Sequence, residues 1–215
     1  MSPDPSAPIT PRGLATQAAL VRAARGVFER DGFLDARIAD IAKEAGSATG
    51  SFYSYFQSKE AIFGAVVDAL NEEMHNPPSL EVLLGQAEGL VARVAESHRG
   101  FLRAYKRNVD LMRVIDEVTN ISDDFRRRRA ADAQPIMRSN TKVVRQLQAE
   151  GRADADLDPA TAGRTLSVIV SRSAYVAFVL DEERSFAKLA KTLTRIWINS
   201  LQVPVAAAEL AALDS

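Results

Sequence analysis

Apolar residues recur along most of the chain at intervals of three and four, the spacing that places them on one face of an α-helix. The first such segment begins at Thr10-Pro11, a typical helix start, and stops at Asp31-Gly32, where glycine readily takes the left-handed conformation that ends a helix. Its apolar face is formed by Leu14, Ala18, Val21 and Phe28. Because no stretch alternates apolar and polar residues over a useful length, the pattern predicts an all-α protein.

Two short helices are predicted next, over about 36–44 and about 48–53, with Asp35 expected to cap the first and Ser47 the second. Gly46 lies between them and can take the positive φ of a tight turn. Two helices that cross steeply at a glycine turn are typical of a helix-turn-helix, although a simple packing corner has the same pattern.

The rest of the chain is also predicted to be helical, which gives about nine helices for the whole protein. Ser58 is a suitable N-cap for a long fourth helix, and Asn76-Pro77-Pro78 marks the clearest boundary because proline blocks helix continuation. Pro135 is expected to kink or interrupt one of the later helices. The later helices are predicted over about 80–106, 109–119, 123–150, 159–180 and 185–201.

Composition narrows the possible classes of protein. With 47% hydrophobic and 26% charged residues the chain suits a globular protein, and the absence of cysteine excludes disulfides, thiolate zinc sites and cysteine nucleophiles. The most apolar late stretch, 166–180, is too short to cross a membrane and contains Arg172, so no membrane span is expected. The net charge is −1, and residues 10–63 carry seven basic against six acidic side chains, so bulk charge does not indicate DNA binding.

The motif around the glycine turn is more specific than the charge. Residues 32–63 read GFLDARIADIAKEAGSATGSFYSYFQSKEAIF, which closely resembles the DNA-binding domain of the TetR (tetracycline-repressor-like) family. Two departures stand out: Ala36-Arg37 replaces the usual threonine or serine pair, and Ser47-Ala48 stands where valine is common. The shared features are Gly32-Phe33, Ile41-Ala42, Ala45-Gly46, Gly50, Phe52-Tyr53, Tyr55-Phe56 and Lys59-Glu60.

The resemblance implies which residues meet DNA. Small residues in the third helix would let it approach the floor of the major groove, while tyrosine hydroxyls and a lysine ammonium would bind phosphates. Arg37 would reach a phosphate in place of the missing hydroxyl, or is only a solvated surface charge. The candidate DNA-binding residues are Arg37, Ser47, Ala48, Thr49, Gly50, Ser51, Tyr53, Tyr55 and Lys59.

The resemblance also implies a helical C-terminal domain that binds an effector and forms a homodimer. Large apolar residues of the central helices are candidates for an effector pocket, although such residues more often form core; few charged residues are obvious there, which favours an apolar or amphipathic effector. The candidates are Phe101, Tyr105, Met112, Ile115, Phe125, Met137, Tyr175 and Phe178.

The last two predicted helices carry long apolar faces, which could form a four-helix interface with a second copy or only the core of one chain. The residues on those faces are Leu166, Ile169, Val170, Ala174, Ala177, Leu189, Leu193, Ile196, Trp197 and Leu201.

Other chemistry is weakly indicated. The run Arg126–Arg129 follows two aspartates and is interpreted as a solvated helix surface, since consecutive helical residues point about 100° apart. Asp154, Asp156 and Asp158 resemble the start of a calcium loop, but Pro159 stands in place of the required glycine, so an exposed turn is expected. We expect no metal, no cofactor and no enzymatic activity.

These observations predict a cytoplasmic transcriptional regulator, a repressor that binds a palindromic double-stranded operator as a homodimer and is released by a small-molecule effector. The alternative is a helical small-molecule-binding or interaction protein that does not read DNA. The expected division is a disordered tail over 1–9, a helix-turn-helix domain over 10–57, a ligand-binding and dimerisation domain over 58–203, and a C-terminal tail over 204–215.

Overall fold

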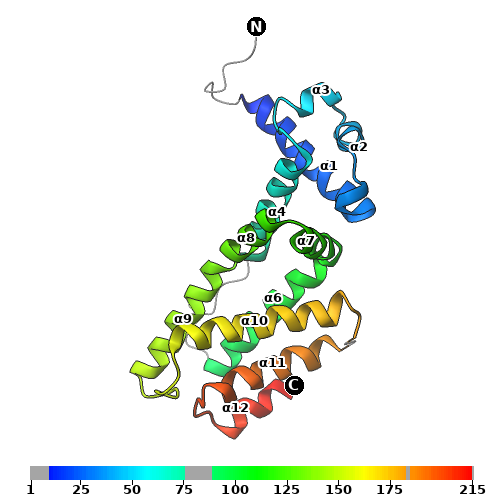
Figure 1. Cartoon of the computed structure of the whole chain (residues 1–215). Helices are drawn as coiled ribbons and strands as arrows, with labels where there is room; N and C mark the ends of the chain where they lie inside the picture. Colours follow the sequence, from blue (N-terminus) through cyan, green and yellow to red (C-terminus); the bar gives the residue numbers. More distant parts are fainter. Residues whose placement is uncertain (1–9, 76–88, 183–184, 215) are drawn as a thin grey trace.

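The structure is a computed structural model that describes residues 10–75, 89–182 and 185–214, and within these ranges the secondary structure is helical, with no strand. The all-α prediction is confirmed. The helices are α1 (Pro11–Asp35), α2 (Ile38–Glu44), α3 (Thr49–Phe52), α4 (Lys59–His75), α6 (Leu90–Arg107), α7 (Val109–Ile121), α8 (Asp123–Asp132), α9 (Gln134–Ala149), α10 (Pro159–Phe178), α11 (Phe186–Ser200) and α12 (Ala207–Ala211), followed by a 3₁₀ turn over Ala212–Asp214. Figure 1 shows α1 to α3 at one end and the remaining helices extending away along α4.

The predicted ends of α1 and the start of α4 follow the capping signals in the sequence. The Thr10 hydroxyl accepts a hydrogen bond from the Gly13 amide at 3.2 Å, and the Ser58 hydroxyl accepts one from the Ala61 amide at 3.2 Å. Gly32 has φ 74°, which breaks the regular helix where the sequence predicted, but the chain resumes helical geometry and α1 ends at Asp35. The short continuation places Phe33 in the core.

The two caps predicted inside the helix-turn-helix are wrong. Because α1 reaches Asp35, α2 begins only at Ile38, and its N-cap Arg37 has no side-chain capping bond. Likewise α3 begins at Thr49, with Ala48 rather than Ser47 as its N-cap. Both helices start later than predicted, beyond the reach of the proposed capping side chains.

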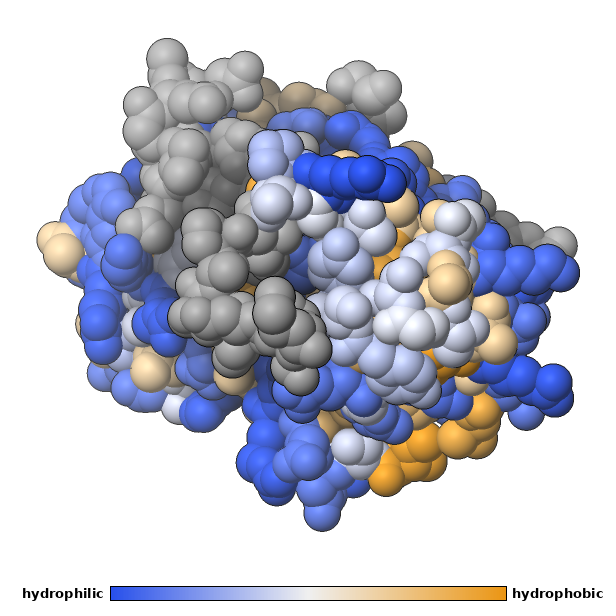
Figure 2. All heavy atoms as spheres, turned by 90° about the horizontal axis from the view of Figure 1, so that it is seen from above, coloured by the Kyte–Doolittle hydropathy of each residue, from blue (hydrophilic) through white to orange (hydrophobic). Residues whose placement is uncertain are grey.

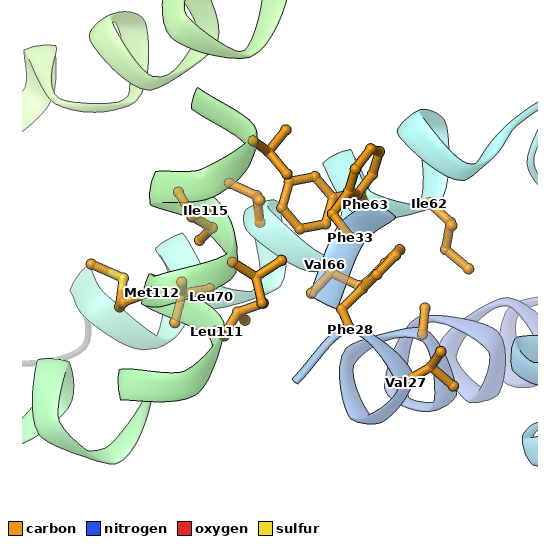
Figure 3. Close-up of a cluster of buried hydrophobic side chains, with 14 of the residues drawn as sticks. Val27, Phe28, Phe33, Ile62, Phe63, Val66, Leu70, Leu111, Met112 and Ile115 are labelled. Atoms are coloured by element: carbon orange, nitrogen blue, oxygen red, sulfur yellow. The ribbon is translucent and has the colours of Figure 1, made fainter. Parts of the chain in front are cut away.

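The main hydrophobic core joins the helix-turn-helix to the helices below it. Figure 3 shows side chains from α1, α4 and α7 pointing toward one another in this cluster. Phe28 and Phe63 meet edge to face with ring centroids 5.1 Å apart, and Phe33 lies 5.0 Å from Phe63. Aromatic pairs of this geometry add to the free energy of burial, so the two parts of the chain share one packed junction.

A second core cluster lies between α6, α9, α10 and α11, with Trp197 among its buried residues. The segment 204–215, expected to be a tail, contains α12, and Leu210 and Leu213 pack against this cluster. Pro135 interrupts the predicted helix over 123–150 as expected, dividing it into α8 and α9. The predicted tail 1–9 and the boundary at 76–78 lie outside the described residues.

Candidate nucleic-acid interface and ligand cavity

The turn between α2 and α3 is closed by two backbone hydrogen bonds. The Ser47 amide donates to the Ala42 carbonyl at 2.8 Å, and the Gly46 amide donates to the Lys43 carbonyl at 3.1 Å. This pair of bonds is the Schellman arrangement, which needs a left-handed residue after the helix, and Gly46 supplies it with φ 65°. The turn predicted from sequence therefore has the geometry of a helix-turn-helix.

The candidate DNA-binding residues from this turn and α3 lie largely on the surface. Ala48, Thr49 and Gly50 are exposed, Ser47 and Ser51 are half-buried, and nothing lies within 4 Å of a Cβ placed at Gly50. Figure 2 views the molecule from this end and shows a pale surface of intermediate hydropathy beside hydrophilic side chains. A surface of small side chains leaves room for close approach by a large flat partner.

The tyrosines of the motif differ in exposure from its phenylalanines. Tyr53 is 56% exposed and Tyr55 is half-buried, whereas Phe52 and Phe56 are buried in the core. The Phe52 ring meets Tyr53 edge to face at 5.4 Å, which fixes the orientation of the exposed ring. The Tyr53 side chain is thus exposed to solvent beside a buried phenylalanine ring.

Lys59 does not present a free ammonium. Its Nζ donates to the backbone carbonyls of Phe33, Leu34 and Ala36 at 2.7, 2.9 and 3.0 Å, and lies 4.8 Å from the centre of the Phe33 ring. Three acceptors satisfy all three N–H donors of an ammonium. In this structure the Lys59 side chain therefore caps the end of α1, and the phosphate contact expected from the motif stays a prediction.

Other cations of this region divide into paired and unpaired groups. Arg25 binds Glu29 at 2.8 Å and Glu73 at 3.0 Å, and Arg30 binds Asp31 at 2.8 Å and Glu44 at 3.2 Å. Bonds from Glu29 and Glu73 outweigh the opposing effect of burial and raise the pKa of Arg25. In this structure both arginines bind carboxylates and do not present a free guanidinium.

Besides Lys59, four cations of the first 59 residues form no ion pair in the described part of the chain. They are exposed, and sequence reasoning selected only one of them, because a count of charges does not separate paired from unpaired side chains. These residues are Arg12, Arg22, Arg37 and Lys43.

The lower helices surround a cavity of about 350 Å³. It lies among α4, α6, α7, α8, α9, α10 and α11, and it reaches the surface between α9 and α10, where Ile136 and Val168 both line it and are exposed. Three of the predicted pocket residues line this cavity: Phe101, Met112 and Met137.

The other five predicted pocket residues are not among the lining residues. Four of them, Tyr105, Ile115, Tyr175 and Phe178, pack in or against the main core, and burial raises the pKa of Tyr105 to about 12. Phe125 packs its ring 5.1 Å from Phe63 and 6.4 Å from Phe33. Large apolar residues at helical spacing predicted the region of the cavity but did not distinguish lining from packing.

Polar groups that the sequence did not single out also line the cavity. His98 is buried, and burial lowers its pKa to about 4, so the imidazole is neutral at neutral pH. Thr194 donates to the Ala190 carbonyl at 2.8 Å and so accepts from His98 Nδ1 at 3.2 Å, which leaves His98 Nε2 as an acceptor. The sequence signal that could have identified His98 is its position among the apolar residues on the buried face of α6.

The arginine run is divided among three environments. Arg126 pairs with Asp123 at 2.6 Å and Arg127 pairs with Asp124, both at the exposed surface as predicted. Arg128 instead reaches α4, and Arg129 lines the cavity. The prediction of one solvated surface is wrong for the last two residues, because successive helical positions face different neighbours.

Most of the residues predicted for a dimer interface belong to the core of the single chain. Ile196, 37% exposed, is the member of the set that is most open to solvent, and Ile169, Val170 and Leu189 are half-buried. The predicted residues that are buried within the chain are Leu166, Ala174, Ala177, Leu193, Trp197 and Leu201.

The acidic loop before α10 is the turn that the sequence predicted. Asp158 caps α10 by accepting from the Thr161 amide at 2.8 Å, and hydrogen bonds from the Thr161 side chain and from its amide lower the pKa of the Asp158 carboxyl. Asp154 Oδ1 accepts from the Asp156 amide at 2.9 Å. Among the described residues no group of three or more metal-ligating side chains is found, and no helix there is long and apolar enough to cross a membrane.

A helix-turn-helix with a glycine turn, joined to a larger helical domain that contains a cavity, is typical of transcriptional regulators that bind DNA and a ligand with one chain. Residues 20–66 match the family described as bacterial regulatory proteins, tetR family, and residues 85–195 match the tetracyclin repressor-like C-terminal domain. The chain therefore belongs to the TetR family of transcriptional regulators, as the motif in residues 32–63 indicated.

One curated relative and two solved structures match over most of their length. The HTH-type transcriptional regulator EthR of Mycolicibacterium smegmatis is 26% identical over 195 residues, covering 89% of this chain and 88% of that protein. A TetR-family regulator structure from Mesorhizobium loti has a TM-score of 0.73 at 19% identity, covering 89% and 98%. The fatty acid degradation regulator FadR of Bacillus halodurans has a TM-score of 0.69 at 15% identity, covering 95% and 100%. The two structures show a shared fold.

Proposed function

We propose that this protein is a homodimeric repressor that binds a palindromic operator and leaves it when a small molecule enters the cavity. The observation that carries the proposal is one chain with an exposed small-residue helix α3 at one end and a 350 Å³ cavity at the other, joined by α4. As a regulator of bacterial transcription it would act in the cytoplasm, and no catalytic activity is proposed.

The helix-turn-helix domain of α1 to α3 (Pro11–Phe52), called the reading head below, would bind DNA through its exposed side chains. Thr49 and Ser51 would contact base edges or phosphates, and the methyl of Ala48 would meet a thymine methyl. Arg37 and Tyr53, both exposed, would bind phosphates, with Tyr55 beside them. Arg12, Arg22 and Lys43 are exposed and without an ion pair among the described residues, so they are further candidates for phosphate contacts.

Dimerisation would use the outward faces of α10 and α11. Val168 of α10 is 49% exposed and Ile196 of α11 is 37% exposed, and a hollow of about 300 Å³ lies between the start of α10 and the end of α11. Two reading heads on one dimer could then enter successive major grooves about 34–36 Å apart. Ile196→Asp should yield a monomer by sedimentation; a dimer of unchanged affinity would refute this interface.

The effector would act through α4 and α8, because both helices line the cavity and contact the reading head. Met74 of α4 lines the cavity, and α4 begins at Lys59 against α1. A ligand shifts the equilibrium only by its difference in affinity for the two states, so the effector must bind better to the state whose heads do not fit the operator.

The proposal is tested by selecting bound genomic fragments and footprinting the selected site. We expect a palindrome protected over both halves, with affinity that falls steeply as salt rises. Tyr53→Ala should weaken DNA binding by about tenfold through the loss of one phosphate contact, and should lower the unfolding temperature by only about 2–4 °C through the loss of its ring contact with Phe52. Ile121→Ala, an equally exposed residue on α7 (57%), is the matched control.

If no fragment is enriched, or if Tyr53→Ala and Ile121→Ala bind alike, the DNA-docking proposal fails. A chain that still binds small molecules in that case would act as a ligand-binding protein without DNA readout.

A further inference from the structure

The cavity has one charged wall, formed by the end of α8. Arg129 and Asp132 stand one helical turn apart, both half-buried and both lining the cavity. Neither side chain forms a hydrogen bond or ion pair with any residue that the structure describes, and Oδ2 of Asp132 is buried without a partner. A buried carboxylate oxygen without a donor is costly, so a ligand that supplies one gains affinity.

The two charges of this wall are of opposite sign. A ligand carboxylate would meet Arg129 but would also face the Asp132 carboxylate, and a ligand ammonium would have the reverse problem. Burying either ion against a wall of zero net charge leaves its lost hydration largely uncompensated. An uncharged group that donates to Asp132 and accepts from Arg129 satisfies both side chains without that penalty.

A hydroxyl is the simplest group with both capacities, since it carries one O–H donor and two acceptor lone pairs. Apolar side chains of α4, α6 and α7 also line the cavity, among them Met74, Phe101 and Met112, together with the neutral imidazole of His98. Its volume of about 350 Å³ is at the small end of ligand pockets. The site is thus built for a small molecule with one polar, uncharged end and an apolar body.

We infer that the effector of this protein is an uncharged amphiphile whose head group, a hydroxyl or a group of the same donor–acceptor character, binds between Arg129 and Asp132. Its apolar body lies against α4, α6 and α7. This inference rests on the proposed role of the cavity as the effector site and adds the chemical class of the ligand.

Binding can be measured without DNA, because the single tryptophan of the chain, Trp197, lines the cavity. Titrations of the full chain followed by Trp197 fluorescence would compare decanol, decanoate and decylammonium, three probes with the same apolar body. We expect decanol to bind about tenfold more tightly than either ion, since each ion loses hydration in the cavity. Tighter binding of decanoate or decylammonium overturns the inference.

Two substitutions change the net charge of the cavity wall in opposite directions. Asp132→Asn leaves Arg129 as the only charge and should move the preference toward decanoate by about tenfold, while Arg129→Gln should move it toward decylammonium by a similar factor. The matched controls are Asp124→Asn and Arg127→Gln, which remove the same groups from the exposed pair on the same helix and should leave the ranking unchanged.

Unchanged ranking in both cavity variants refutes the inference, and so does an equal shift in the controls. Unfolding temperatures identify a variant that does not fold. In that case the inference is tested by the other variant and by the order of the three probe affinities in the wild-type protein. Absence of a fluorescence change with all three probes refutes the inferred ligand class but leaves operator binding, measured separately by footprinting, as the test of the proposed function.

Discussion

Arg128 of α8 donates a hydrogen bond from Nη2 to the backbone carbonyl oxygen of Gly64 in α4, at 3.0 Å, and its guanidinium also pairs with Asp68. A Cβ placed at Gly64 would lie 2.9 Å from Arg128 Nη1, so the absence of a side chain there allows the approach. The residues that follow, Arg129 and Asp132, line the cavity. Helix α8 therefore contacts both the cavity and the helix that leads to the reading head.

Arg128→Met should loosen α4 from α8. Loss of the bonds to Gly64 and Asp68 is expected to cost about 1.5 kcal/mol of unfolding free energy, the low end for hydrogen bonds to a charged group, because Arg128 is only half-buried. Hydrogen exchange of the α4 amides should become faster, measured by mass spectrometry. Arg127→Met is the control, because that residue pairs only with exposed Asp124. Equal exchange in both variants would show that Arg128 does not hold α4.

Lys59→Met should lower the unfolding free energy of the reading head, and any loss of DNA affinity should accompany that loss of stability. The side chain satisfies three carbonyls at the end of α1, and their loss should cost about 2 kcal/mol, or about 4–8 °C in the unfolding temperature of a chain of this size. Lys43→Met, on an exposed lysine, should change the unfolding temperature by less than about 2 °C. Weaker DNA binding of Lys59→Met at unchanged stability would restore the phosphate contact predicted from the motif.

The elements that could be predicted from sequence are those governed by local physics. Thr10 and Ser58 cap their helices, Gly46 turns the chain, and Pro135 divides α8 from α9, because each depends on backbone geometry over a few residues. The matching family pattern in residues 32–63 then identified the reading head.

The residues that could not be predicted depend on contacts distant in sequence. Lys59 has the same charge whether it meets a phosphate or the carbonyl of Phe33, and only the packing of α4 on α1 decides between them. Similarly, Phe101 lines the cavity while Phe125, an equally apolar ring, packs on Phe63. Periodicity gives the inward face of a helix but not whether that face meets a neighbour or an open space.

Gly46→Ala and Gly50→Ala should have opposite effects on stability. Gly46 holds φ 65°, so alanine there is strained and should cost about 1 kcal/mol, even though nothing lies within 4 Å of the added Cβ. Gly50 lies in helical α3 with equal room, so alanine should be neutral or stabilise by about 0.5–1 kcal/mol.

DNA binding should separate the same two variants in a second way. If α3 lies against the floor of the major groove, the methyl of Gly50→Ala should weaken operator binding although the protein is as stable as before. Denaturant unfolding and filter binding on both variants provide the measurements. Retention of full operator affinity by Gly50→Ala would place Gly50 away from the DNA.

His98 should make the protein less stable in mild acid. Burial lowers its folded-state pKa to about 4, below the ordinary value of 6.5, so the unfolded chain binds a proton more readily than the folded one between these values. The contribution of neutral His98 is complete above about pH 6.5 and is lost as the pH falls toward 4, by about 3 kcal/mol in total. His98→Asn keeps a donor for Thr194 but does not titrate. Urea unfolding at pH 7 and pH 5 should therefore show a smaller pH dependence in the variant, and equal dependence in both proteins would exclude His98 as its source.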